Sequence, residues 1–403
     1  MPKMISDYNR QLEWLFNQFP AFQKIGSKAY KPTLENTDKL IDLFDIDLTS
    51  MRFVHVAGTN GKGTTCSILA SYFTEAGLKT GLFTSPHIND FRERIRVNGK
   101  LVEKPFVYNF IKKVRAINFE FAPSFFEISW VMALKHFQTE ACEIVVVETG
   151  LGGRLDATNV ISPLISVITN IGLDHTAILG NTLPEIAFEK AGIIKDNIPV
   201  VIGNRQKETT ATFEQVSSTR NSALHFVEHG NDANTFDLNK ATAKKTLELL
   251  SAKVVPFEES LFDRSIVNLA VNTGIRGRFQ VLSERPLIIA DAAHNFDGIL
   301  RLVRDVKLKF TKRKVHAIYG ASSDKDMLKL ITLFPHDWSY YFTTFKNKRS
   351  YTVDELMQFG NKTNLVIDYF DSPESALGKA QSVQNKEDII LIFGSFFLLE
   401  EII

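Results

Sequence analysis

The sequence has 403 residues, more than a single hydrophobic core usually serves, and this length predicts two domains. Hydrophobic residues make up 44% and charged residues 23%, and 47 Lys and Arg stand against 46 Asp and Glu. This balance is typical of a soluble globular protein and gives no support to a nucleic-acid-binding or membrane-surface protein.

Cysteine content and hydropathy indicate the compartment. The two cysteines, Cys66 and Cys142, lie in apolar segments, which favours a reducing environment over a disulfide scaffold. The stretch "MPKMISDYNRQLEWLF" carries charge throughout and lacks the apolar core of a signal peptide. The most apolar segment, "IILIFGSFFLL", is shorter than the ~20 residues that span a bilayer. We therefore expect a soluble cytoplasmic protein with no membrane and no nucleic-acid partner.

Short apolar runs alternate with helical patterns along most of the chain, as in α/β folds with parallel sheets. The first predicted strand is "RFVHVAG", followed by a helix over "KGTTCSILASYFTEAG" in which Gly77 is a plausible residue just after the helix end. Nearly continuous apolar composition predicts strands covered on both faces. The other predicted strands are "KTGLFTSP", "EIVVVETG", "LISVITNIG", "IPVVIGN", "PLIIADAAHN", "KVHAIYGAS", "SYYFTTF" and "DIILIFGS".

A domain boundary is expected near residue 277, between two sets of strands. Gly274, Gly277 and Pro286 flank the start of the second set, which gives domains 1–276 and 277–403. The stretch 207–239 is polar and weakly periodic, so it gives the weakest structural signal.

A glycine-rich turn in "HVAGTNGKGTT" lies between the first strand and its helix. Exposed backbone amides and the helix dipole favour an anion there, and Lys62 adds a positive charge. The spacing G-x-x-G-K-G-T differs from the common G-x-x-x-x-G-K-[ST]. A glycine–lysine turn can be only a tight connection, but the strand before it and the helix after it favour phosphate binding.

Polar residues follow three further strands: Ser85-Pro86-His87, then Glu148, then Asp174 and His175. Each alone can be an ordinary turn or a solvated strand end. Ligands in open α/β sheets bind beyond the carboxyl ends of the strands, however, and these ends gather around the phosphate turn. Mg²⁺ prefers oxygen ligands, so Ser85 and Glu148 suit it, and His175 is a less usual ligand.

A helix is predicted to begin at Thr182, where Thr182 and Glu185 have capping-box spacing. Ile186, Lys190 and Ile193 share one face of it. A lysine near a helix C-terminus ordinarily complements the dipole, so the residues alone favour a structural role for Lys190.

Taken together, the motifs resemble a known family. "HVAGTNGKGTT", "TSPHINDFRERI", "VETGLGGRLDATN", "LDHTAILG", "EKAGIIK", "GRFQ", "DAAHN" and "DKD" follow the order found in folylpolyglutamate and dihydrofolate synthases of the Mur ligase superfamily. The resemblance runs from about residue 20 to the C-terminus. In that family the phosphate turn has glycine before threonine, which accounts for its unusual spacing.

The resemblance implies the fold and the activity. The fold is α/β, with a P-loop NTPase-like, mainly parallel sheet domain that binds ATP and pteroate (1–276). A smaller Rossmann-like Mur ligase C-terminal domain that binds glutamate (277–403) follows it. The activity is that of an ATP-dependent amide ligase: a carboxylate is phosphorylated, the glutamate amine attacks the acyl phosphate, and phosphate leaves. Phosphorylation is needed because a carboxylate is a poor electrophile.

The resemblance also implies site residues, which we assign by matching each position to the family motifs. Lys62, Lys190 and His175 are expected to be catalytic, with Lys190 carbamylated so that it presents anionic oxygens to metal. That reaction needs neutral lysine and therefore a depressed pKa. Ser85, Glu148 and His175 resemble the magnesium ligands, with two Mg²⁺ ions expected. The implied ATP contacts are Thr59, Asn60, Gly61, Lys62, Gly63, Thr64, Asn239, Arg278 and Asp291.

The resemblance also implies substrate contacts. "SFFEIS" matches the pteroate segment, where Phe125 and Phe126 offer stacking surface, although a Phe pair is more often core. "GGRLDATN" resembles bifunctional bacterial enzymes that act on dihydropteroate and on reduced folates. The implied substrate-binding residues are Ser124, Phe125, Phe126, Glu127, Leu155, Asp156 and Ala157 for pteroate, Lys325 near L-glutamate or the phosphates, and in addition Thr84 and His294.

Two departures from the family pattern stand out. Phe296 replaces the proline that usually follows His-Asn, and the segment before Asn239 is short and lacks the usual Pro-Leu-x-Gly approach. Asn239 is for this reason the weakest of the ATP assignments.

Alternatives remain. A folylpolyglutamate synthase without dihydrofolate synthase activity, or another Mur-type amide ligase, fits many of the same motifs. A cell-wall ligase of that superfamily carries an extra N-terminal domain, for which the residues before Gly58 leave little room. A P-loop kinase or a regulator would not need "DAAHN" and "DKD", and a non-catalytic binding module would not need intact metal and phosphate residues. A monomer is expected.

Overall fold

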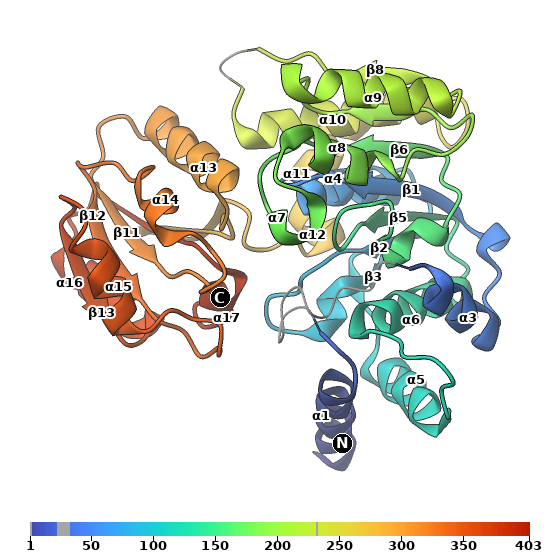
Figure 1. Cartoon of the computed structure of the whole chain (residues 1–403), viewed down its shortest axis with the longest axis horizontal. Coiled ribbons are helices and arrows are strands. Elements are labelled where there is room, and N and C mark those ends of the chain that lie inside the picture. Colours follow the sequence, from blue (N-terminus) through green and yellow to red (C-terminus); the bar gives the residue numbers. More distant parts are fainter. Residues whose placement is uncertain (1, 22–32, 231–232) are drawn as a thin grey trace. The chain divides into compact units, whose positions relative to one another are not determined.

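The structure, a computed structural model, describes residues 2–21, 33–230 and 233–403. The chain divides into two compact units, Met1–Ile275 and Arg276–Ile403, each built around its own sheet (Figure 1). Within the described ranges, no helix combines the length and hydropathy that a membrane crossing needs.

The first unit contains an eight-stranded sheet in the order β4-β3-β2-β5-β1-β6-β7-β8. Neighbouring strands in the part β2-β5-β1-β6-β7-β8 of this order pair in parallel. The strands β3 and β4 form an antiparallel extension at one edge. Its strands are β1 (Arg52–Ala57), β2 (Thr80–Phe83), β3 (Ile95–Val97), β4 (Lys100–Leu101), β5 (Ile144–Glu148), β6 (Ile165–Ile168), β7 (Val200–Ile202) and β8 (Leu224–Phe226).

Helices cover both faces of this sheet, because successive strand residues point to opposite sides. Phe53 and Val145 pack with α3, α5 and α6 in one core, whereas Val54 and Val146 pack with α4, α10 and α11 in another. The helices are α1 (Pro2–Gln18), α3 (Glu35–Leu43), α4 (Lys62–Glu75), α5 (Lys104–Ala116), α6 (Phe125–Thr139), α7 (Thr176–Leu179), α8 (Leu183–Ala191), α9 (Lys207–Thr219), α10 (Thr235–Leu250), α11 (Glu259–Val267) and α12 (Leu269–Thr273).

The second unit contains a six-stranded sheet in the order β13-β12-β11-β14-β10-β9, parallel except for β9. Its core is rich in aromatic rings, among them Tyr319, Phe334 and Phe342. Its strands are β9 (Gln280–Glu284), β10 (Leu287–Asp291), β11 (Val315–Tyr319), β12 (Ser339–Thr343), β13 (Ile367–Phe370) and β14 (Ile389–Phe393). Its helices are α13 (Phe296–Lys309), α14 (Met327–Ile331), α15 (Val353–Gly360), α16 (Pro373–Val383) and α17 (Phe396–Glu400).

The α/β class with two mainly parallel sheets is confirmed, and each of the nine predicted strands is present. The weakly periodic stretch 207–239 forms α9, β8 and the start of α10. The helix expected from Thr182 is α8, with Thr182 as its cap, but it ends at Ala191. Ile193 therefore lies beyond the helix and does not extend its face.

Candidate active site

The glycine turn after β1 has the backbone that its sequence predicts. Gly61 adopts a left-handed conformation with φ of 82° and is the N-cap of α4, with no side chain capping the helix. A Cβ at Gly61 would stand 2.2 Å from the Asn239 Oδ1, and one at Gly58 would stand 1.9 Å from the Thr169 Oγ1. The first amides of α4 have no helical acceptors, so the turn offers them to an anion.

The segment after β6 holds this turn in place. The Thr59 N–H donates to the Asn170 carbonyl at 2.9 Å, and the Asn60 N–H donates to the Asn170 Oδ1 at 2.8 Å. The Thr169 hydroxyl donates to the Asn60 carbonyl at 2.6 Å, and the Gly172 N–H donates to the Thr59 hydroxyl at 2.9 Å. Thr169 and Asn170 are supporting residues that no motif above assigns, although "LISVITN" ends in them.

The predicted phosphate and metal residues lie at the same edge of the sheet. The Lys62 Nζ is 3.9 Å from the Glu148 Oε1, and the Ser85 N–H donates to the Glu148 Oε2 at 3.1 Å. The Glu148 carboxylate is buried. Lys62 also donates to the Thr59 carbonyl at 3.3 Å, so its ammonium lies over the turn.

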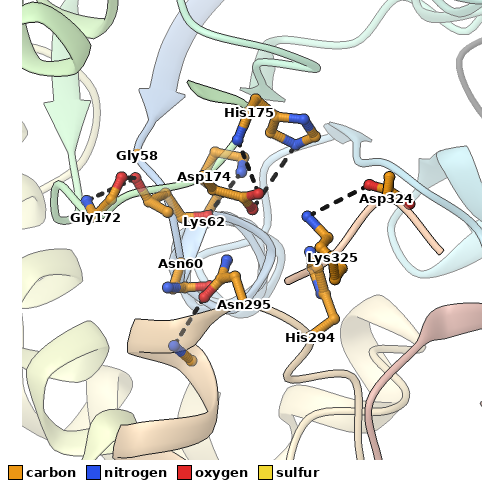
Figure 2. A network of polar contacts seen from close by, with 12 residues as sticks. Gly58, Asn60, Lys62, Gly172, Asp174, His175, His294, Asn295, Asp324 and Lys325 are labelled. Atoms are coloured by element: carbon orange, nitrogen blue, oxygen red, sulfur yellow. Dashed lines mark hydrogen bonds and ion pairs between the residues drawn. The ribbon is translucent and has the colours of Figure 1, made fainter. Parts of the chain in front are cut away.

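His175 and Asp174 are neighbours of the turn in Figure 2. The His175 backbone has φ of 51°, its N–H donates to the Asp174 Oδ1 at 2.9 Å, and its Nε2 lies 3.8 Å from the Asp174 Oδ2. Within the described residues, no group of three or more His, Cys, Asp and Glu is arranged to hold a metal ion. The donors present, a buried carboxylate and a serine hydroxyl, fit Mg²⁺, which completes its shell with water and substrate phosphates.

Lys190 is buried beneath the glycine turn, where its Nζ donates to the Gly58 carbonyl at 2.9 Å. Burial, and then the nearby Lys62 charge, lower the pKa of Lys190 to about 7, although Asp174 and Asp156 oppose that shift. At neutral pH a substantial fraction of this amine is therefore unprotonated and nucleophilic. The environment supplies the depressed pKa that carbamylation requires.

Asn239 also reaches this edge from α10. Its side chain packs against Gly61, and its Oδ1 accepts a long hydrogen bond of 3.4 Å from the Thr65 hydroxyl. The short segment before Asn239 thus still brings it to the glycine turn.

The predicted pteroate segment forms the N-terminus of α6. Ser124 and Glu127 make a reciprocal capping box, which uses both side chains locally. Phe125 is buried and stacks on Phe16 at 4.2 Å between ring centres. Phe126 is only partly buried and lies against Gly150, where a Cβ would be 2.5 Å from its ring. Of the two rings, Phe126 is the one with surface left to offer a flat heterocycle.

The "GGRLDATN" loop is organised around Asp156. Its carboxylate accepts hydrogen bonds from the Leu151 N–H at 2.7 Å and from the Thr158 N–H at 3.0 Å. The Thr158 hydroxyl joins it to the buried His55 ring, at 2.8 Å from the Nε2. Burial raises the pKa of Asp156 and lowers the pKa of His55 to about 3. Ala157 is buried next to Asp156, and Leu155 is partly buried.

In the second unit, the predicted residues lie at the carboxyl end of β10 and in nearby loops. The Asp291 carboxylate accepts from the Phe279 N–H at 2.7 Å and the Ala293 N–H at 2.8 Å, and burial raises its pKa. The Arg278 guanidinium lies 4.9 Å from the ring centre of Phe396. The His294 ring also faces Phe396, at 5.9 Å.

Lys325 lies in a loop that is tied to a neighbouring loop. Its Nζ is 3.9 Å from the Asp324 carboxylate (Figure 2), which also pairs with Arg349 at 2.6 Å. The Tyr351 hydroxyl donates to the Lys325 carbonyl at 2.7 Å. The His294 Nδ1 lies 2.8 Å from the Ala292 carbonyl and, since a carbonyl only accepts, this nitrogen is the donor.

Such a fold and glycine turn define a nucleotide-dependent α/β enzyme, and comparisons with known proteins identify its family. The Mur ligase middle domain matches residues 56–282, and the Mur ligase glutamate ligase domain matches residues 277–396. The chain belongs to the Mur ligase family, and the predicted enzyme class, an ATP-dependent amide ligase, is confirmed.

Its relatives narrow the branch. The dihydrofolate synthase/folylpolyglutamate synthase of Bacillus subtilis is 31% identical over 99% of both chains. That of Buchnera aphidicola from Acyrthosiphon pisum is 34% identical over 86% of this chain and 87% of the relative. The structure of Escherichia coli FolC in complex with DHPP and ADP has a TM-score of 0.85 at 27% identity and covers 98% of this chain and 96% of the other. The resemblance to this branch is confirmed.

Proposed function

We propose that the chain adds L-glutamate to dihydropteroate, giving dihydrofolate, and to the γ-carboxylate of reduced folates, with ATP converted to ADP and phosphate. The double activity is supported by relatives that carry both names and by the full "GGRLDATN" loop. The observation that carries the proposal is the meeting of the glycine turn, Glu148 and Lys190 at one sheet edge in a chain of this family.

Each residue at this edge has a role in activating the carboxylate. The amides from Gly61 to Thr64 and the Lys62 ammonium hold the phosphates of ATP, with Thr59 and Asn60 shaping the turn and Asn239 closing over Gly61. Ser85, Glu148 and His175 are the side chains for Mg²⁺, which we expect as two ions. Bound Mg²⁺ supplies charge neutralisation for the transferred phosphoryl group. Thr84 precedes this set at the end of β2.

Lys190 is proposed to react with CO₂ through its neutral amine, forming an N–C bond and releasing a proton. The carbamate would keep one N–H, which could still donate to the Gly58 carbonyl, and would add two anionic oxygens that suit Mg²⁺. A Lys190→Ala variant should lose about 100-fold or more in kcat, since a charge-stabilising group is missing from the transition state. Short carboxylic acids such as propionate should restore part of the activity. Lack of a carbon-13 carbamate signal in wild-type enzyme with labelled bicarbonate would argue against the modification.

The remaining assignments follow the two units. Residues 1–276 would bind ATP and pteroate, with Ser124, Phe125, Phe126 and Glu127 on one side and Leu155, Asp156 and Ala157 on the other. Residues 277–403 would bind L-glutamate. There Arg278 and Asp291 reach ATP, and His294 and Lys325 contact glutamate or phosphates. A related structure is described with Mn, AMPPNP and L-glutamate bound, which supports a nucleotide and L-glutamate as ligands.

One assay separates the proposal from its nearest alternative. Purified enzyme with ATP, Mg²⁺ and L-glutamate is given either dihydropteroate or tetrahydrofolate, and phosphate release and product mass are recorded. We expect both acids to gain the mass of a glutamate residue. Turnover of tetrahydrofolate alone would leave a folylpolyglutamate synthase without the first activity. We further propose a cytoplasmic monomer with no membrane or nucleic-acid partner, which sedimentation with and without substrates would test.

A further inference from the structure

The Arg94 guanidinium is a buried cation near the proposed site, and the proposed function does not use it. Arg94, in the segment "FRERI", is the last residue of the short helix η3 (Phe91–Arg94), directly before β3, and is 3% exposed. Its Nε donates to the His87 Nδ1 at 2.8 Å, and its guanidinium carbon lies 5.6 Å from the ring centre of Phe125. With the residues in the ranges 2–21, 33–230 and 233–403, Arg94 makes no ion pair and no second hydrogen bond.

The acids near Arg94 are committed to other donors. Glu93 accepts hydrogen bonds from the backbone amides of Ile88, at 2.8 Å, and Asp90, at 3.1 Å. Glu148 accepts from the Ser85 N–H and pairs with Lys62, and it reaches Arg94 only through its longer-range charge. His87 cannot serve as a counter-ion, because an imidazole is either neutral or positively charged and only accepts a hydrogen bond from Arg94 here.

A buried guanidinium without a direct ion pair is costly, even where Glu148 and Glu93 act on it through their charges. A guanidinium carries five N–H donors, and contacts with the described residues use one of them. Burial lowers the pKa of Arg94 to about 10, so the group is still protonated at neutral pH. Such a cation is therefore set to receive an anion whose oxygens fit its planar fork.

The position of Arg94 selects the anion. The Arg94 guanidinium lies 5.6 Å from the ring centre of Phe125, at the start of the segment proposed for the pterin end of the substrate, and it is within the influence of the Glu148 charge at the phosphate turn. A pteroate with its pterin at that segment and its acid group at the phosphate turn would bring this acid group toward Arg94. We propose that Arg94 binds the substrate carboxylate that becomes phosphorylated and so orients its free oxygen toward ATP.

The inference rests on the proposed function, because it takes a pteroate as the acid. The guanidinium would hold one carboxylate oxygen while the other remains available to attack phosphorus. It also offsets the repulsion between the carboxylate and the phosphate oxygens, which opposes their approach. Arg94 would thereby favour an acid over a neutral ligand of the same shape.

The test compares dihydropteroate with its uncharged carboxamide, using direct binding to full-length enzyme. Wild-type enzyme should prefer the carboxylate by about 30-fold, the worth of a charge-assisted bidentate pair, and Arg94→Met should reduce that preference to within about threefold. Arg94→Lys, which retains charge without the fork, should fall between them. Arg92→Gln is the matched control: Arg92 lies in the same short helix but is paired with Asp90 at 2.7 Å, so the preference should remain at its wild-type value.

The outcomes are distinguishable. An unchanged preference for the carboxylate in Arg94→Met or Arg94→Lys, with product still formed by wild-type enzyme, would overturn the role of Arg94 alone. Failure of wild-type enzyme to bind or use dihydropteroate would overturn the proposed function and this inference together. If Arg94→Met does not fold, the reduced preference of Arg94→Lys decides the question.

Discussion

Both units contain a strand that leads into a helix at the carboxyl edge of a parallel sheet, and they finish this connection differently. In the first unit, β1 passes through Gly61 into α4, and no side chain caps that helix. In the second unit, β10 leads into α13, and Asn295 caps this helix. The Gly298 N–H donates to the Asn295 Oδ1 at 2.8 Å. A cap without a side chain leaves the first amides of the helix available to an anion, which makes the first connection open, whereas a side-chain cap takes up one of these amides, which makes the second connection more closed.

The largest effect, on the use of ATP, is expected from a substitution that fills the glycine turn between β1 and α4. Gly61→Ala would force a Cβ to 2.2 Å from Asn239 at a left-handed backbone position. Since turn and helix must both shift, we expect kcat/KM for ATP to fall by about 1,000-fold or more.

Gly77→Ala is the matched control for that substitution. Gly77 has φ of 84° just beyond the other end of α4, and a Cβ there meets nothing within 4 Å. It should cost about 1 kcal/mol in stability through backbone strain and leave the KM for ATP unchanged. Equal losses of ATP use in both variants would show that strain, rather than the shape of the turn, matters.

The second largest effect is expected from Lys190, which is buried beneath the glycine turn. Lys190 has a pKa of about 7 in the folded chain and 10.5 as its ordinary value, so the unfolded state binds more protons between these values. Unfolding free energy should therefore rise as pH increases from about 7 toward 10.5, by an amount on the order of a few kcal/mol. Urea unfolding of wild-type and Lys190→Met in CO₂-depleted buffer at several pH values measures the difference. Parallel profiles of the two proteins would contradict a buried, depressed lysine.

A substitution in the connection between β10 and α13 should have a smaller effect. Asp291→Asn leaves one of the amides of Phe279 and Ala293 facing an NH₂ group in place of an acceptor. We expect a loss of about 1–3 kcal/mol in the unfolding free energy, measured by urea titration. A similar loss in Gly61→Ala without loss of ATP use would remove the distinction between the two connections.

The smallest effect is expected at the cap of α13. Asn295→Ala removes the acceptor for the Gly298 amide and should cost about 1 kcal/mol, whereas Asn295→Asp should retain the cap. Thermal unfolding of both variants tests this, and equal melting temperatures for the two would mean that the cap is not the group that matters there.

The predictable part of the fold follows from burial on both faces. β1, β5 and β14 are mostly apolar, buried runs and are visible in the sequence. The missed strands lie toward sheet edges and carry partly exposed residues, so hydrophobic patterning does not mark them; they are β3, β4, β8, β9 and β13. Their pairing depends on neighbours that are distant in the sequence.

The site residues also differ in whether the sequence alone indicates them. Gly61 and Lys62 belong to a contiguous motif, and the sequence indicates their chemistry directly. The link from His55 through Thr158 to Asp156 joins β1 to a loop about a hundred residues later, and only the folded sheet brings them together. Likewise, the difference between the covered Phe125 ring and the exposed part of Phe126 depends on Phe16 from α1.

The central claim is that the open turn serves direct phosphorylation of a carboxylate. Dihydropteroate labelled with oxygen-18 in its carboxylate, incubated with ATP, Mg²⁺ and L-glutamate, tests this most directly by mass analysis of the released phosphate. Each released phosphate should carry one labelled oxygen, because the attacking carboxylate oxygen leaves with phosphorus when the amine displaces it. Unlabelled phosphate released together with the glutamate adduct would contradict it.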